Sequence, residues 1–295
     1  MEQATQSPSQ ADAAHYMAIK AAEGAGVPQN WAAALDHLRH SAQLGSRLAH
    51  AELAGLSGEW ALALDILAGA ALPDSRWLLS RNSLDLANWL GSPRVKMVSE
   101  KPRIAAVEDI AVPEICDWLI ARARPKLARA KITDYVSGQA HVVSSTRTNS
   151  VCDFRGADSD LILAILRARI AEVTKMQVQT MESAHILHYS VGQEFRPHFD
   201  IILDPNAPDY AKQFAEGRQR VLTFLLALND GYEGGETEFP AIRMRWKGRR
   251  GRALFFWNVE PDGALDRLTV HGGLPVTRGE KWMLSQWIGG RPPEA

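Results

Sequence analysis

Cysteine is scarce in this chain of 295 residues, which contains only Cys116 and Cys152. Two thiols cannot provide the disulfide framework that stabilises small secreted domains, so a reducing compartment is indicated. Long apolar runs are missing too, because no stretch reaches the roughly 18 continuous apolar residues needed to cross a bilayer. Residues 1–13 are polar and lack both a basic segment and an apolar core, unlike a secretory signal. We therefore expect a cytoplasmic protein that does not enter a membrane.

A large net charge is also absent, since 33 Lys and Arg residues nearly balance 34 Asp and Glu residues. Such a chain has no general attraction for nucleic acid or for an anionic membrane. Hydrophobic residues make up 46% of the chain and charged residues 23%, which excludes a disordered or collagen-like protein. The length is about twice that of a typical domain of ~150 residues, so two domains are expected.

The N-terminal part of the sequence is rich in Ala and Leu at helical spacing. Before it, residues 1–12 are small and polar and are predicted to be disordered, because they have little to bury. Trp31-Ala-Ala-Ala-Leu35-Asp36 is echoed by Trp60-Ala-Leu-Ala-Leu64-Asp65, which predicts repeated helix pairs over residues 13–72. This segment resembles the Sel-type relatives of tetratricopeptide repeats. Fewer than about three units are visible, so we expect this segment to need packing against the adjacent part of the chain for its stability. The alternative is an Ala-rich helical hairpin without repeat ancestry.

The rest of the chain predicts a connector, two helices and then strands. Residues 73–100 are rich in turn residues and are predicted as a connector with one short helix at 83–90; amphipathic helices are predicted at 113–125 and 161–174. After about residue 184 the apolar pattern changes to a period of two. The predicted strands are Ala184–Tyr189, Arg220–Leu228, Thr237–Phe239, Arg252–Trp257, Leu268–His271 and Lys281–Gln286.

Many short strands without intervening helices indicate an antiparallel sheet fold rather than a doubly wound sheet. The helices precede the strands, so they are expected to buttress one face of the sheet. The predicted fold class is α+β, a double-stranded β-helix (jelly roll) over residues 101–290, preceded by the small all-α repeat domain.

Two histidines and one aspartate fit a metal centre. His198 and Asp200 are two residues apart on an extended segment, so both side chains point to the same face. His271, on a predicted strand just before a Gly-Gly turn, supplies a third ligand. Two imidazoles and one carboxylate on one face of an octahedron leave three positions open, as in non-haem ferrous oxygenases. His185 and His188 are three apart on a predicted strand and point to opposite faces, so they cannot bind one metal together.

Lys281 is a candidate for binding an anion beside this centre. It lies ten residues after His271, across a predicted hairpin turn at 272–279, so pairing of the two strands would direct both side chains into one interior. A buried ammonium is unfavourable without an anionic partner. A dicarboxylate such as 2-oxoglutarate would supply that partner: its keto-acid end binds iron and its other carboxylate meets Lys281. Lysines are otherwise mostly exposed.

Five blocks of sequence occur in the order of a known family. They are Tyr189-Ser-Val-Gly192-Gln193-Glu194-Phe195-Arg-Pro197-His198-Phe-Asp200, Arg220-Val-Leu-Thr223-Phe-Leu-Leu-Ala-Leu228-Asn229-Asp230, Gly234-Gly235-Glu236-Thr237-Glu-Phe239-Pro240, Gly251-Arg-Ala-Leu-Phe-Phe256-Trp257-Asn258, and His271-Gly-Gly-Leu-Pro275-Val276 with Gly279-Glu280-Lys281-Trp282. From about residue 101 to 288 the chain resembles the prolyl 4-hydroxylase branch of the ferrous iron and 2-oxoglutarate-dependent dioxygenases.

This resemblance implies roles for individual residues. The metal ligands of the family match His198, Asp200 and His271, which would hold Fe(II). Lys281 matches the basic residue that pairs with the distal carboxylate of 2-oxoglutarate.

Other matching positions concern the cosubstrate and the substrate. Tyr189 and Thr223 match residues that line the cosubstrate pocket. Arg147 resembles a residue of the family's substrate loop, and Trp287 falls where an aromatic residue flanks the metal. The implied reaction hydroxylates an unactivated carbon, that of a prolyl residue in a peptide or protein, while 2-oxoglutarate yields succinate and carbon dioxide. Ascorbate is a further implied cofactor.

Other functions stay open. The stretch 243–252 contains six basic residues and Trp246, which would suit a nucleic-acid oxygenase of the same chemistry. The balanced overall charge favours a solvated rim instead, and we expect no nucleic-acid partner. A small molecule is an alternative substrate, although the repeats favour a protein by offering a docking surface. The chain could also be a non-catalytic adaptor, an alternative that the intact ligand set disfavours.

Overall fold

The computed structural model describes residues 9–72, 86, 89–91, 93–134, 139–201 and 219–290. The chain divides into two compact units. The helical unit contains residues 1–91 together with 155–169, and the sheet unit contains 92–154 and 170–295. Residues 155–169 thus group with the helices, whereas the sequence predicted one continuous domain over 101–290. Among the described residues, no helix has the length and apolar character needed to cross a membrane.

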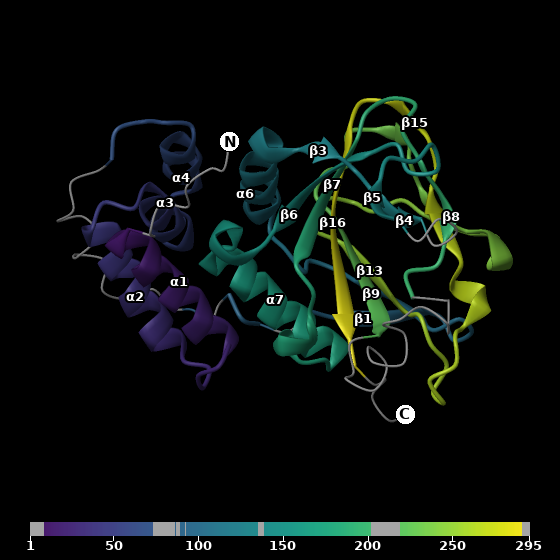
Figure 1. Ribbon diagram of the computed structural model, residues 1–295, viewed down its shortest axis with the longest axis horizontal. Helices are drawn as coiled ribbons and strands as arrows, with labels where there is room; N and C mark the ends of the chain where they lie inside the picture. Colours follow the sequence, from purple (N-terminus) through teal and green to yellow (C-terminus); the bar gives the residue numbers. More distant parts are fainter. Residues whose placement is uncertain are drawn as a thin grey trace. The chain divides into compact units, whose positions relative to one another are not determined.

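The helical unit consists of two helix hairpins and the beginning of a further helix (Figure 1). Its helices are α1 (Gln10–Glu23), α2 (Trp31–Gln43), α3 (Arg47–Leu56), α4 (Trp60–Leu67) and the first part of α7 (Leu161–Thr174). Leu35, Leu38 and Ala42 are buried. Two hairpins agree with the predicted helix pairs, and their descent from Sel-type repeats stays a prediction.

The first helix begins earlier than predicted. The Ser9 hydroxyl accepts a hydrogen bond from the Asp12 backbone N–H, and the Asp12 carboxylate accepts one from the Ser9 backbone N–H. This reciprocal capping box satisfies backbone donors at the start of a helix. The predicted disorder of residues 1–12 therefore does not hold for residues 10–12, which are helical; residues 1–8 lie outside the described residues.

A buried carboxylate joins three helices of this unit. Glu52 of α3 is fully buried, and its Oε1 lies 2.5 Å from Nε2 of His15 in α1. Its Oε2 accepts a hydrogen bond of 2.6 Å from the backbone N–H of Leu161, the first residue of α7. The first N–H groups of a helix have no partner within the helix, and the helix dipole favours a negative charge there. Burial raises the pKa of Glu52, an effect that His15 opposes. Glu52 thus ties α7 to the helix hairpins.

We expect Glu52→Ala to lower the free energy of unfolding by about 3–5 kcal/mol, because removing one partner of a buried pair strands the other. Urea denaturation measures the loss. Asp36→Ala is the matched control: Asp36 pairs with Arg39 at the surface, so a loss below about 1 kcal/mol is expected. Equal losses in the two variants would contradict the role given to Glu52.

The sheet unit contains two facing antiparallel sheets. In its described residues, eight strands form a larger sheet in the order β1-β2-β13-β9-β16-β7-β6-β3, and four form a smaller sheet in the order β12-β11-β14-β8. The larger sheet comprises β1 (Val95–Ser99), β2 (Ile104–Val107), β3 (Ala128–Arg129), β6 (Ser150–Phe154), β7 (Ala184–Tyr189), β9 (Arg220–Ala227), β13 (Ala253–Trp257) and β16 (Lys281–Gly289). The smaller sheet comprises β8 (Phe195–His198), β11 (Thr237–Phe239), β12 (Met244–Trp246) and β14 (His271–Gly273).

Two short ladders and helix α6 also belong to this unit. The ladders are β4 (Ile132–Asp134) with β5 (Gln139–Val142), and β10 (Glu233–Gly234) with β15 (Val276–Arg278). Helix α6 (Pro113–Ala123) packs against β7 and buries Trp118. The core holds buried side chains of both sheets, among them Leu225, Phe239, Phe256 and Met283. The α+β jelly roll with a buttressing helix is thereby confirmed.

Several elements differ from the prediction. Strands appear before residue 184, and β1 lies inside the predicted connector 73–100. Strand β2 was missed because Ile104–Val107 is apolar throughout and shows no alternation. The predicted helix at 83–90 lies mostly outside the described residues.

The predicted strand Leu268–His271 is wrong. Arg267–Thr269 forms a 3-10 turn, and β14 begins only at His271. The Asp266 carboxylate accepts from the Leu268 backbone N–H, and the Thr269 hydroxyl donates to the Asp266 carbonyl. Local bonds of this kind compete with a strand ladder.

Candidate metal centre and adjoining cavity

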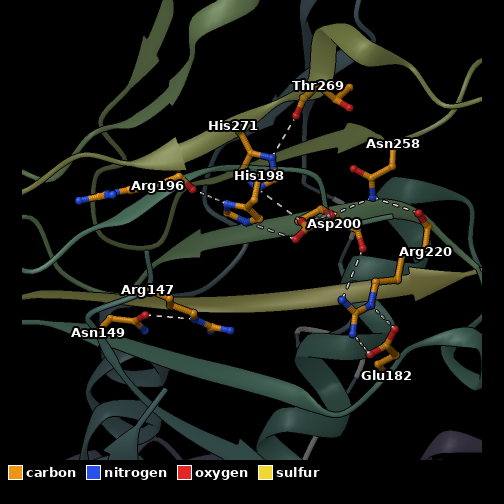
Figure 2. Close-up of polar contacts among 11 residues, drawn as sticks. Arg147, Asn149, Glu182, Arg196, His198, Asp200, Arg220, Asn258, Thr269 and His271 are labelled. Atoms are coloured by element: carbon orange, nitrogen blue, oxygen red, sulfur yellow. Dashed lines mark hydrogen bonds and ion pairs between the residues drawn. The ribbon is translucent and has the colours of Figure 1, made fainter. Parts of the chain in front are cut away.

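His198 and His271 face each other because the strands that carry them are paired. Their Cα atoms are partners in the β8–β14 ladder, and their ring centroids lie 4.4 Å apart (Figure 2). Gly272 permits this approach, since a Cβ atom there would lie 2.8 Å from the backbone oxygen of Phe195. The two glycines after His271 therefore continue the strand and do not form the predicted turn.

Both imidazoles present Nε2 to the same point. Nδ1 of His198 lies 2.9 Å from the Arg196 carbonyl, and Nδ1 of His271 lies 3.0 Å from the Thr269 carbonyl (Figure 2). A carbonyl only accepts, so each Nδ1 carries a proton and, in the neutral ring, Nε2 is the nitrogen with the lone pair. Burial lowers the pKa of His271 to about 4, so this ring is neutral at pH 7. A neutral imidazole with a free Nε2 is the form that binds a metal.

Asp200 completes the group of three predicted ligands. Its Oδ1 lies 3.5 Å from Nε2 of His198, and its Oδ2 lies 3.5 Å from Nε2 of His271. The ligand atoms of all three residues lie within 4.8 Å of one another. Burial alone raises the pKa of Asp200, but His271, His198 and the Thr223 hydroxyl together hold it below its usual range. Two imidazoles and one carboxylate fit Fe(II) with open coordination positions.

A cavity adjoins the three ligands and receives side chains from both sheets. Its lining includes Arg147, Tyr189, Phe195, Thr237, Lys281 and Trp287 beside the three ligands. Tyr189 and Lys281 are Cα partners where β7 and β16 pair, and Nζ of Lys281 lies 5.0 Å from the Tyr189 ring centroid. The strands of His271 and Lys281 do not pair as predicted, because β14 and β16 belong to different sheets. The two side chains reach one cavity from facing sheets instead.

Lys281 is buried and forms no ion pair within 4.0 Å in the described part of the chain. Its side chain is 2% exposed, and Nζ donates to the Gly235 carbonyl over 2.6 Å. Burial lowers the pKa of Lys281 to about 7, although Glu236 acts in the opposite direction. A buried ammonium facing a cavity fits an anionic ligand, because the anion would offset the desolvation of the charge.

Asn229 holds the backbone on both sides of Lys281, and the sequence analysis did not single it out. Its Nδ2 donates to the Glu280 carbonyl and its Oδ1 accepts from the Trp282 N–H, each over 2.8 Å. The amide therefore fixes the start of β16. In the sequence, Asn229 comes shortly after the apolar run of β9, and a polar residue at the end of a buried strand is the pattern that could have indicated its role.

Thr223 lies elsewhere than expected. The resemblance assigned it to the cosubstrate pocket, but its hydroxyl donates to Oδ2 of Asp200 over 2.7 Å. The register of β9 explains this, because Thr223 is paired with Trp287, at the opposite end of β16 from Lys281. Thr237 lines the cavity instead, and its Gly-Gly-Glu-Thr block was the signal that could have identified it.

Arg147 and Trp287 line the cavity with unused donors. Arg147 is 8% exposed, its Nε donates to Asn149, and its guanidinium lies 4.7 Å from the Phe195 ring centroid. Among the described residues, its two terminal nitrogens have no hydrogen-bond partner. The Trp287 ring lies 3.6 Å from the Arg220 guanidinium, and its Nε1 likewise lacks a partner in the described structure.

Other candidates from the sequence do not join this site. His185 pairs with Asp153, and His188 pairs with Glu280. Several side chains of the basic stretch 243–252 are engaged within the protein. These contacts are Arg245 with Glu238, Lys247 with the Tyr232 carbonyl, Arg250 with Asp117, and Arg252 with Glu108. Charges that are neutralised within the protein contribute little to phosphate binding, which supports the solvated rim.

Comparison with known proteins agrees with this geometry. Residues 184–289 match the model of the 2OG-Fe(II) oxygenase superfamily. Probable prolyl 4-hydroxylase 3 of Arabidopsis thaliana is 32% identical over 217 residues, which cover 67% of this chain and 73% of the relative. Prolyl 4-hydroxylase 5 of the same plant is 33% identical over 217 residues, which cover 67% and 72% of the two chains.

A solved structure shows the same fold. The viral collagen prolyl hydroxylase of Paramecium Bursaria Chlorella virus-1, in complex with 2OG, has a TM-score of 0.50 at 24% identity and covers 63% of this chain and 96% of its own. The family model and the two curated relatives, which exceed 30% identity over two thirds of the chain, establish that this chain belongs to the prolyl 4-hydroxylase family of the 2OG-Fe(II) oxygenases.

Proposed function

We propose that this chain is an Fe(II)- and 2-oxoglutarate-dependent dioxygenase that hydroxylates a prolyl residue in a peptide or protein. The observation that carries the proposal is the arrangement of groups around one cavity. His198, Asp200 and His271 present free ligand atoms from one side, and Lys281 presents a buried ammonium from the facing sheet. A keto dicarboxylate complements both, with its keto-acid end at the metal and its other carboxylate at Lys281.

The chemistry follows from this arrangement. Bound Fe(II) with 2-oxoglutarate supplies the oxidant that inserts one oxygen atom of dioxygen into a carbon–hydrogen bond. The other oxygen atom would enter succinate, which 2-oxoglutarate would form by losing the carboxylate next to its keto group as carbon dioxide. Tyr189, Thr237 and Lys281 would hold the cosubstrate. Phe195 and Met283 add apolar side chains to the lining of the cavity.

A prolyl peptide is supported by the unused donors of the cavity. Proline has no backbone N–H, so at this residue the backbone offers a carbonyl acceptor and no donor. The terminal nitrogens of Arg147, which lines the cavity, are donors that match such an acceptor. The relatives named as prolyl 4-hydroxylases support the same substrate class. Contacts of the helical unit with a protein substrate, a role for ascorbate and a cytoplasmic location stay predictions from the sequence.

We expect the protein, supplied with Fe(II) and 2-oxoglutarate, to add one oxygen atom to proline within a proline-rich peptide. Tandem mass spectrometry locates the hydroxyl group, and succinate release counts turnovers. Free L-proline and methylated single-stranded nucleic acid are the matched alternative substrates. Turnover of either in preference to the peptide would contradict the proposal. Failure to bind metal and to release succinate would favour the adaptor.

We expect Arg147→Leu to raise the KM for the peptide about tenfold or more, since a hydrogen bond from a charged group contributes about 1.5–3 kcal/mol. The KM for 2-oxoglutarate should stay near the wild-type value. Arg249→Leu is the control, because Arg249 is exposed. A peptide KM unchanged by Arg147→Leu would remove Arg147 from the substrate site.

We expect binding of 2-oxoglutarate to weaken as the pH rises above about 7. The lowered pKa of Lys281, about 7, means that the ammonium is present below this pH and is lost above it. If only the charged form binds, the apparent Kd rises by close to tenfold per pH unit on the alkaline side. Calorimetry with Mn(II) in place of Fe(II), between pH 6 and 9, measures this.

Lys281→Arg is the control for this titration, because a guanidinium stays charged throughout the range. Its pH profile should be flat. An equally steep rise in Kd for both proteins would assign the titration to another group.

A further inference from the structure

Thr223 contacts the metal-binding carboxylate from a position closed to solvent. It lies on β9 and is fully buried, and its hydroxyl oxygen is 2.7 Å from Oδ2 of Asp200. A hydroxyl group has one proton to donate, whereas its oxygen can also accept. Which neighbour receives that proton therefore depends on what else the hydroxyl oxygen contacts.

Asn258 settles the direction of this bond. Its Nδ2 lies 3.0 Å from the hydroxyl oxygen of Thr223 and 3.1 Å from the Arg220 carbonyl. The Arg220 carbonyl only accepts, so the NH2 group and not the amide oxygen of Asn258 must face it. The same NH2 group then donates to Thr223, whose single proton is left for Asp200. Asn258, Arg220 and Asp200 lie together in Figure 2.

The backbone around this chain of donors is held independently. The Asn258 N–H donates to the Val221 carbonyl over 2.8 Å, and the Asn258 carbonyl accepts from the Asp266 N–H over 3.1 Å. Asn258 is 1% exposed. Because its main chain is anchored and its side chain is buried between the Arg220 carbonyl and Thr223, its amide keeps one orientation.

We propose that Asn258 and Thr223 are positioning residues that hold the Asp200 carboxylate in the rotation required for binding one metal ion together with His198 and His271. The inference rests on the proposed metal site and adds to it a direction of hydrogen bonding: Asn258 donates to Thr223, and Thr223 donates to Asp200. Each histidine ligand already has a backbone carbonyl that fixes its ring. The donor chain gives the carboxylate the corresponding support.

Metal affinity of the protein without 2-oxoglutarate tests this directly. We expect Thr223→Val to weaken Mn(II) binding, measured by electron paramagnetic resonance titration, by about 10- to 100-fold, the usual effect of removing an outer partner of a ligand. Thr223→Ser keeps the hydroxyl and should restore binding. Thr174→Val is the matched control, because it removes another buried hydroxyl bond, to the Ile170 carbonyl, away from the metal ligands.

Asn258→Asp tests the direction. A carboxylate at this position accepts from Thr223 and draws its proton away from Asp200, so Mn(II) binding should weaken as in Thr223→Val. Added negative charge acting through space would strengthen binding of a cation instead. Adding Thr223→Val to Asn258→Asp should cause no further loss, because both changes break the same link.

The outcomes separate the two proposals. Failure of the wild-type protein to bind Mn(II) would overturn the proposed function. Wild-type binding that Thr223→Val leaves unchanged, or that Asn258→Asp strengthens, would overturn the donor chain alone. Thermal unfolding shows whether the Thr223→Val protein folds. If it does not, Thr223→Ala removes the same hydroxyl group, and Mn(II) binding that is unchanged in that variant would equally overturn the donor chain.

Discussion

The pairing of β8 with β14 is the contact on which the candidate site depends. It sets His198 opposite His271, and it requires a glycine at position 272 because the two backbones approach too closely for a side chain. Asp200 follows two residues beyond His198 and turns toward the same point. The facing sheet then contributes Lys281 through its own pairing of β16 with β7. The site is thus assembled from two ladders whose registers are set independently.

The polar groups of the cavity fall into two kinds. The metal ligands are each held by another group of the protein, two by backbone carbonyls and Asp200 by a buried hydroxyl. Their geometry is therefore established by the fold before any metal binds. Lys281, Arg147 and Trp287 instead carry donor capacity that the described protein does not use fully. The supported metal ligands fit a cofactor that stays bound. The unused donors fit ligands that bind and are released in each turnover.

The sequence predicted the ligands because their signal is local. A spacing of two places His198 and Asp200 on one side of an extended segment wherever that segment lies. His271 was found for a partly wrong reason, since the strand expected before it is a turn. Lys281 was placed correctly at the cavity, although the hairpin invoked for it does not form.

The remaining site residues depend on register, which the sequence does not reveal. Thr223 and Thr237 are both buried threonines on strands, and only the pairing of β9 with β16 shows which one faces Asp200. Asn229 and Asn258 act through contacts with residues distant in the sequence. In the fold, β2 escaped detection because a strand buried on both faces has no alternation to detect.

The division of the chain into a helical unit and a sheet unit limits where the chain can be truncated. Residues 155–169 belong to the helical unit although they lie within the oxygenase sequence, and the start of α7 is buried on all sides. Cutting the chain after residue 91 would remove the two helix hairpins from the start of α7. The apolar side chains that this helix buries would then be exposed, and such a surface is prone to aggregation. A single cut between the hairpins and residue 92 therefore cannot separate the two units, because the start of α7 would lose the helices of its own unit.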